Sequence, residues 1–118
     1  MSSERDSIYL AHILECIERI QNYTGNNKET FINSSLVQDA VLRRLQTMAE
    51  STQRLSDELK AKAPEVDWRA LSGFRNILVH DYLSGIDLEQ VWGAVTLYLP
   101  SLELAVKGLA EDLSEDNN

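Results

Sequence analysis

The feature that most constrains this chain is a helical spacing of apolar residues along nearly its whole length. Between residues 7 and 23, apolar side chains recur at steps of three and four: Tyr9, Leu10, Ile13, Leu14, Ile17 and Ile20. No stretch alternates apolar and polar residues as a half-buried strand does. Only five glycines and two prolines interrupt the 118 residues, and Gly25 suits the left-handed end of this first helix. The pattern predicts an all-α fold.

A second helix is expected to open at Ser35, where Ser35 and Gln38 fit a capping box. Its apolar seam continues over about 18 residues and contains one polar member: Val41, Leu45, Met48, Thr52, Leu55 and Leu59. The seam is too short for a free-standing coiled coil, which favours a helix packed within a bundle. Because Pro64 disfavours helical geometry at the residue before it, the helix should stop there.

Two more helices complete the prediction. The third begins at Asp67, a good N-cap, ends near residues 81–83, and has an apolar stripe of Leu71, Phe74 and Leu78. The fourth begins at Asp87, with Gln90 in capping-box position, and contains Pro100, where we expect a kink. Its predicted buried face is Leu88, Val91, Trp92, Val95, Tyr98, Leu102, Val106, Leu109 and Leu113.

These segments predict one domain over residues 1–118, an antiparallel up-and-down bundle of four main helices. Residues 26–34 leave room for a short fifth helix, and the acidic tail of residues 111–118 is expected to fray. The single cysteine, Cys16, excludes an intrachain disulfide and a cysteine-based zinc site. We expect no signal peptide and no membrane span. The single cysteine favours a reducing compartment, and we expect a cytoplasmic protein.

The formal net charge of −8 argues against a broad basic surface for nucleic acid. The charge is unevenly distributed, however. Residues 43–75 carry a net +2, from five acidic residues and seven basic ones: Arg43, Arg44, Arg54, Lys60, Lys62, Arg69 and Arg75. The rest of the chain carries −10. A local phosphate-binding site therefore remains compatible with an acidic protein.

The third helix carries the residues with the clearest chemical potential. Arg75 and His80 are five residues apart, so they lie about 140° apart around a helix, with Asn76 in the arc between them. We interpret this arc as a polar front opposite the apolar stripe. From spacing alone, a lone arginine and histidine on one helix are usually surface or capping residues, since a histidine near a helix C-terminus is favoured by the helix dipole.

Residues 75–82 read Arg-x4-His-x-Tyr, which resembles the motif of HEPN-domain proteins, specifically the HepT-like toxins. The similarity extends over about residues 6–110 and includes the long helix of residues 39–59, Trp68, Asn76, Asp87, residues 91–92 and residues 99–102. One departure is Ala49-Glu50, where relatives often carry Gly-Glu. Glu50 itself is kept, and alanine is a good helix former.

The resemblance implies a homodimeric HEPN bundle that acts as a metal-independent endoribonuclease toxin, without a cofactor. Arg75 and His80 would be the catalytic residues, one pair from each subunit. The histidine can exchange protons at neutral pH, and the guanidinium can hold a phosphate through two hydrogen bonds. The expected product is a 2′,3′-cyclic phosphate.

Four further residues are expected to support the site: Asn76, Asp81, Glu50 and Asp39. Asn76 and Asp81 could act on His80 or simply face solvent or cap the turn. Asp39 and Glu50 are 11 residues apart on one helix face, which suits a cleft or a solvated surface equally. The resemblance also implies that Tyr82 accepts AMP from a cognate MntA-type nucleotidyltransferase antitoxin, which would use ATP. A simple packing role for Tyr82 stays open.

His12 is far from the motif in sequence and is predicted to be structural or exposed. Cys16 is predicted to be a small core residue, because no His-Asp pattern supports nucleophilic catalysis by it. No glycine-rich phosphate loop and no cluster of metal-binding residues is present in the sequence. The alternative to a ribonuclease toxin is a non-catalytic helical adaptor that binds nucleotide or a nucleotidyltransferase partner. In that case Arg75 and His80 would serve recognition only.

Overall fold

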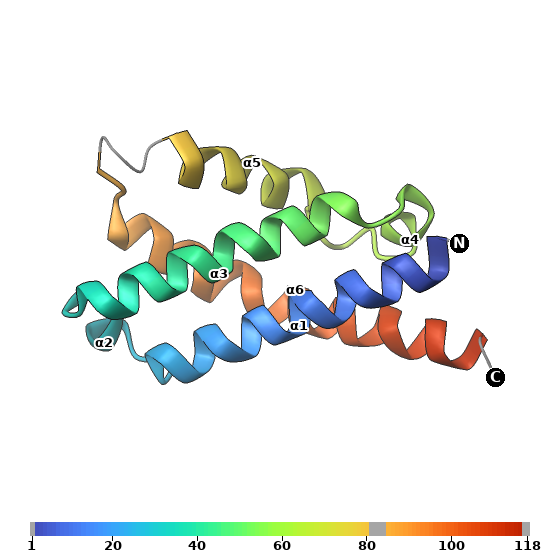
Figure 1. Cartoon of the computed structure of the whole chain (residues 1–118), viewed down its shortest axis with the longest axis horizontal. Coiled ribbons are helices and arrows are strands. Elements are labelled where there is room, and N and C mark those ends of the chain that lie inside the picture. The colour runs from blue at the N-terminus through green and yellow to red at the C-terminus, as the bar shows by residue number, and fades with distance from the viewer. Residues whose placement is uncertain (1, 81–84, 117–118) are drawn as a thin grey trace.

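The computed structural model describes the backbone of residues 2–80 and 85–116, and their side chains other than those of residues 2, 3, 74, 76, 77, 79, 80 and 116. Within these ranges the chain has helices and no strand (Figure 1). The helices are α1 (Ser2–Thr24), α2 (Lys28–Ile32), α3 (Ser35–Arg54), α4 (Asp57–Ala61), α5 (Trp68–His80) and α6 (Leu88–Asp116). The predicted all-α fold with four main helices is therefore confirmed, as is a short helix within residues 26–34.

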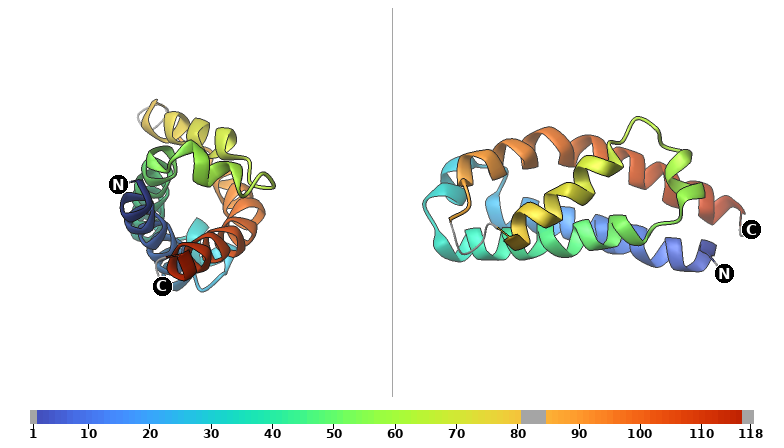
Figure 2. Two further views of the ribbon diagram at one scale, coloured as in Figure 1. Left: turned by 90° about the vertical axis from the view of Figure 1, so that its right-hand side faces the viewer. Right: turned by 90° about the horizontal axis from the view of Figure 1, so that it is seen from above.

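The four long helices run up and down along the long axis of the molecule (Figures 1 and 2). The most extensive packing joins α1 to α3, and α6 packs against α1. Helix α5 packs on α3 and has no comparable packing against α6 within the described residues. The four-helix bundle is therefore closely packed around α1 and more open between α5 and α6. None of the described helices has an apolar stretch long enough to cross a membrane.

The core is formed by the apolar faces that the helical spacing predicts. In α1, four of the six expected side chains are at most 1% exposed: Leu10, Ile13, Ile17 and Ile20. Cys16 is also fully buried, as predicted. The short helix α2 closes one end of the bundle, because its Phe31 is buried and stacks on Trp92 with ring centroids 5.6 Å apart.

The start of α3 differs by one residue from the sequence prediction. Ser34 is the N-cap, and its Oγ accepts a hydrogen bond of 3.2 Å from the backbone N–H of Val37. The side-chain amide of Gln38 donates to the carbonyl oxygens of Phe31 and Ile32, at 3.1 and 2.9 Å. The predicted capping box of Ser35 and Gln38 is therefore wrong, because adjacent serines offer two caps and Gln38 instead satisfies the end of α2.

The predicted long helix up to Pro64 is also interrupted. Helix α3 ends at Arg54, and Ser56 starts α4 by accepting from the backbone N–H of Leu59 at 3.2 Å. Asp6 of α1, only 4% exposed, accepts from the Ser56 N–H at 2.8 Å and from its hydroxyl at 2.6 Å. A buried carboxylate thus stabilises the break. Leu55 and Leu59 are still buried, so the spacing indicated burial correctly but not helix continuity.

The remaining helix boundaries agree better with prediction. Asp67 and Asp87 act as N-caps, since each carboxylate accepts from backbone N–H groups two or three residues later. Gly25 has a φ of 59° at the end of α1, as expected of a left-handed residue there.

Helix α6 differs from the sequence prediction at two places, residues 98–99 and the C-terminal tail. Tyr98, predicted to be buried, is 37% exposed, and Leu99 occupies the core at 4%. Steps of three and four allow either residue between Val95 and Leu102, which is why the spacing could not decide between them. The helix continues through Pro100 to Asp116 and is visibly bent along its length (Figure 2). Residues 111–116, expected to fray, are helical, and Leu113 is 7% exposed.

Candidate functional site

Helix α5 positions Arg75 at the edge of its packed face. Leu71 and Leu78 of α5 are each 5% exposed and anchor the helix on α3. On a regular helix Arg75 lies about 40° from Leu71 and about 60° from Leu78, closer to the apolar stripe than the predicted polar front implied. The side chain of Arg75 is accordingly half-buried, at 36% exposure.

Glu50 of α3 meets Arg75 at this edge. Its Oε1 lies 3.5 Å from the Nε of Arg75, and its side chain is 40% exposed. The Nε atom is shielded from solvent, and no described group completes a hydrogen bond to it. The carboxylate therefore acts on the Nε side of the guanidinium through its charge. Among the described side chains no hydrogen bond engages the terminal amino groups, which are the donors that suit a phosphate.

The structure describes the other predicted site residues only in part. Asn76 and His80 belong to α5, but their side chains are outside the described part of the chain, as are Asp81 and Tyr82 altogether. Asp39 is exposed on α3. It lies 11 residues from Glu50, about 16 Å along the helix, which is beyond the reach of Arg75. The pair that the described residues bring together is thus Arg75 and Glu50.

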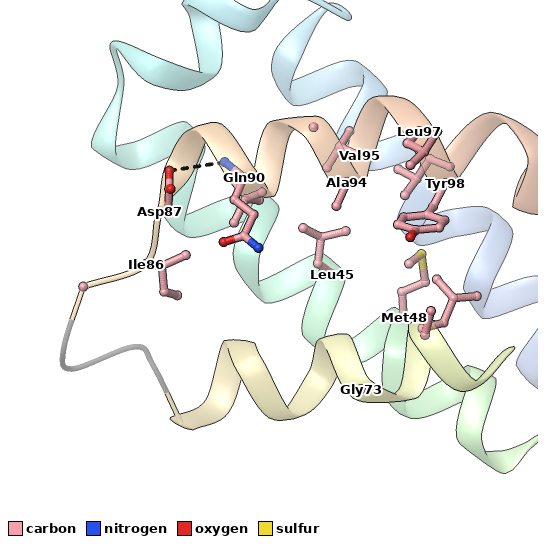
Figure 3. Close-up of a pocket in the computed structure, with 16 residues that line it drawn as sticks. Leu45, Met48, Gly73, Ile86, Asp87, Gln90, Ala94, Val95, Leu97 and Tyr98 are labelled. Carbon is pink, nitrogen blue, oxygen red and sulfur yellow. Dashed lines mark hydrogen bonds between the residues drawn. The ribbon is translucent and has the colours of Figure 1, made fainter. Parts of the chain in front are cut away.

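A largely apolar pocket of about 560 Å³ lies between α3, α5 and α6. Leu45 and Met48 of α3 rise into it between the two other helices (Figure 3). On the rim, Leu97 and Tyr98 of α6 are 68% and 37% exposed. The helical spacing gave no sign of this pocket, because it counted Tyr98 as core and could not indicate how far α5 stands from α6.

A polar cluster occupies the opposite side of α3, against α1. The Nδ1 of His12 lies 2.6 Å from the Oγ of Ser51, and its Nε2 lies 3.6 Å from the Sγ of Cys16. The same sulfur lies 3.6 Å from the Oγ1 of Thr47. These contacts join two packed helices, which agrees with the predicted structural roles of His12 and Cys16.

Two arginines gather at Tyr23, near the end of α1. Hydrogen bonding to Arg44 and, less strongly, to Arg19 holds the pKa of the Tyr23 hydroxyl below its usual value. The phenol in turn raises the pKa of both guanidiniums. Arg19 also pairs with Glu15 at 3.1 Å.

Among the described side chains, no group of three or more histidine, cysteine, aspartate or glutamate residues could hold a metal ion.

Comparison with known proteins places the chain in a family. Residues 13–109 match the family model described as ribonuclease HepT-like. A protein of Methanocaldococcus jannaschii named "Gamma-glutamylcyclotransferase and putative RNase" is 36% identical over 112 residues, which cover 94% of this chain and 50% of that relative. The chain therefore spans half the length of that relative.

A relative of similar length comes from Thermococcus cleftensis. This protein, named "Probable ribonuclease HepT", is 33% identical over 96 residues, which cover 80% of this chain and 86% of the relative. No solved structure matches the chain significantly. The family match covers most of the chain, including α5 and Glu50, and the chain belongs to the HepT-like ribonuclease family of HEPN proteins.

Proposed function

We propose that this protein is a metal-independent endoribonuclease, the toxin of a toxin–antitoxin pair, in which Arg75 and His80 carry out catalysis. The observation that supports this most is the partly exposed guanidinium of Arg75, which lies on the same helix as His80 and has its Nε 3.5 Å from the Glu50 carboxylate of α3. The family match over residues 13–109 and the relatives named as ribonucleases support RNA as the substrate.

The proposed reaction needs only groups that these residues supply. One imidazole takes the proton of a ribose 2′-hydroxyl, and the 2′-oxygen forms a bond to phosphorus. The bond from phosphorus to the 5′-oxygen breaks, and an imidazolium gives that oxygen a proton. The products are a 2′,3′-cyclic phosphate and a 5′-hydroxyl. The guanidinium of Arg75 stabilises the negative charge that develops on the phosphate oxygens.

A homodimer would supply the second histidine. The face of α6 beside the pocket supports this assembly, since Leu97 and Leu104 are 68% and 74% exposed and lie seven residues apart on one side of the helix. A second copy seated on this face would cover both leucines and bring two α5 helices together. Isolated exposed leucines are common, but two on one side of a helix, of which Leu97 lines an apolar pocket, are typical of an interaction surface.

Tyr82 is the proposed site of neutralisation. It follows His80 by two residues. An AMP group transferred to its hydroxyl from ATP by an MntA-type nucleotidyltransferase antitoxin would bring a phosphodiester close to Arg75. The added negative charge would compete with the RNA phosphate, by the same electrostatic logic as phosphorylation.

Cleavage of RNA in the presence of a chelator tests the nuclease. We expect the wild-type protein to produce 2′,3′-cyclic phosphate ends, and His80→Ala and Arg75→Ala to lower kcat/KM by about 10²- to 10⁴-fold. Arg69→Ala removes an exposed arginine from the first turn of the same helix and serves as the matched control. Intact RNA with the wild-type protein would contradict the nuclease proposal and favour the adaptor function.

Intact-mass measurement tests the modification. After incubation with the cognate antitoxin and ATP, the wild-type protein should gain the mass of an adenylyl group and lose nuclease activity. Tyr82→Phe should gain none, while Tyr98→Phe, which removes a partly exposed tyrosine of α6, should gain the same mass as wild type. The same mass gain in Tyr82→Phe would exclude Tyr82 as the acceptor.

Sedimentation tests the dimer. Replacing Leu97 and Leu104 together by aspartate should produce monomers with little nuclease activity, because each would leave a charge in the proposed interface. Ile8→Asp changes a side chain of α1 that is also 68% exposed, and it should remain dimeric. A dimer that survives the double substitution would place the interface elsewhere.

A further inference from the structure

The face of α3 that carries Glu50 also carries an exposed arginine, Arg43. The two residues are seven positions apart, so their side chains leave the helix only about 20° apart. No carboxylate lies within 4.0 Å of the Arg43 guanidinium among the side chains that the structure describes. Arg43 therefore presents a positive charge to solvent on the same side of α3 that meets Arg75.

The register between α3 and α5 shows how Arg43 stands relative to the catalytic helix. Gln53 Nε2 lies 3.5 Å from the carbonyl oxygen of Ser72, and Glu50 meets Arg75. The step from Gln53 to Glu50 along α3 therefore matches the step from Ser72 to Arg75 along α5, so the two helices are antiparallel. Continued to the end of α5, this register sets the His80 backbone level with residue 45. Arg43 lies one half-turn beyond that level.

This placement separates Arg43 from the point where Arg75 acts. The rise of seven residues puts Arg43 about 10 Å along α3 from Glu50, in the direction that α5 follows toward His80. With this offset along the helix, each guanidinium can bind a phosphate of its own. Successive phosphates of one RNA strand can meet them both.

We propose that Arg43 binds a backbone phosphate of single-stranded RNA that flanks the cleaved phosphodiester. This inference rests on the proposed function, since it extends the substrate contact from Arg75 to a second subsite. It also gives a role to Arg43 within the region of residues 43–75, which carries +2 in a chain of net −8. The rest of the surface repels RNA, so the strand is guided along α3 beside α5.

Binding of a short single-stranded RNA to proteins that carry His80→Ala, which prevents cleavage, tests the contact. Adding Arg43→Ala should weaken binding about fivefold at low salt, the effect of one exposed charge pair. It should also reduce the slope of log K against log salt by about 0.7, the value for one phosphate contact on a single strand. Arg43→Lys should restore most of the slope. An unchanged slope in Arg43→Ala would overturn the proposal.

Substrate length separates this role from a structural one. In the cleavage assay, Arg43→Ala should raise KM for an oligonucleotide but leave KM and kcat for a dinucleotide unchanged, because a dinucleotide has no flanking phosphate. Arg69→Ala, an exposed arginine of α5 about 120° around the helix from Arg75, should change neither. If wild type cleaves RNA but Arg43→Ala affects both substrates equally or neither, the flanking contact is wrong. If wild type cleaves no RNA, the proposed function fails first.

Discussion

The two sides of α3 are built differently. Toward α1 it packs extensively, buries Cys16 completely and holds the contacts of His12 with Ser51 and Cys16. Toward α5 and α6 it borders a pocket of about 560 Å³ and offers the partly exposed ion pair of Arg75 and Glu50. One helix thus separates a closed interface from an open one.

The difference indicates a division of labour within one small domain. A closed interface with satisfied polar groups stabilises the fold but leaves no room for a substrate. An open face gives up burial, which is acceptable where a ligand or a second subunit covers it. The comparison therefore predicts that substitutions toward α1 change stability and that substitutions toward α5 and α6 change activity or assembly.

The largest effect is expected from a core truncation in α1, the helix of the closed side. Ile17→Ala should lower the free energy of unfolding by about 2–5 kcal/mol, because Ile17 is fully buried and its loss leaves a cavity. Leu97→Ala on the open side should cost at most about 0.5 kcal/mol at low protein concentration. Urea unfolding at several concentrations measures both. If both variants lost a similar free energy of unfolding at every protein concentration, the contrast between the two sides of α3 would be wrong.

A smaller effect is expected at the tie between α1 and α4. Asp6→Ala removes both hydrogen bonds to Ser56 and should cost about 1–3 kcal/mol, since two donors of Ser56 lose their buried acceptor. Glu4→Ala, an exposed neighbour on α1, should stay within about 0.5 kcal/mol of wild type. Equal stability of Asp6→Ala and Glu4→Ala would show that the tie contributes nothing.

How much of the fold the sequence predicts depends on the range of the interaction. Local signals succeeded: the caps at Asp67 and Asp87 and the buried stripe of α1 follow from neighbouring residues. The break at Ser56 did not, because its stabilising partner, Asp6, is 50 residues away in the chain. The spacing of apolar residues indicates which face of a helix is buried. It cannot indicate a helix break that a carboxylate far away in the chain stabilises.

The site follows the same rule. The spacing predicted the helix α5, and the resemblance to HepT-like proteins pointed to Arg75 on it and to Glu50 on the long helix as site residues. The contact between their side chains, and the position of Arg75 at the packed edge, depend on the register of α3 against α5. That register is set by packing of whole helices and leaves no mark in either segment. The pocket beside α6 is hidden for the same reason.

On the open side, Glu50→Gln should lower kcat for RNA cleavage by about fivefold without raising KM. The pair is partly exposed, so its loss is worth about 1 kcal/mol at most, and the amide still fills the space. Removing a negative charge also lessens repulsion of the RNA phosphate, which opposes any rise in KM. Steady-state kinetics with thermal melting as control checks this. Unchanged kcat, or a fall matched by a lower melting temperature, would contradict a positioning role for Glu50.

The smallest expected effect is a pH dependence on the closed side. The pKa of Tyr23 is lowered in the folded protein, first by Arg44 and then by Arg19, so folding favours the phenolate. The stabilisation is present above the unfolded pKa of about 10 and is lost as pH falls through the lower folded value. Unfolding free energy should therefore rise slightly with pH in that window, and Tyr23→Phe should abolish this increment. Phenolate absorbance should show that Arg44→Gln raises the Tyr23 pKa more than Arg19→Gln does. A larger rise of the Tyr23 pKa in Arg19→Gln than in Arg44→Gln would show that Tyr23 interacts mainly within α1. Tyr23 would then not be one of the contacts that join α1 to α3.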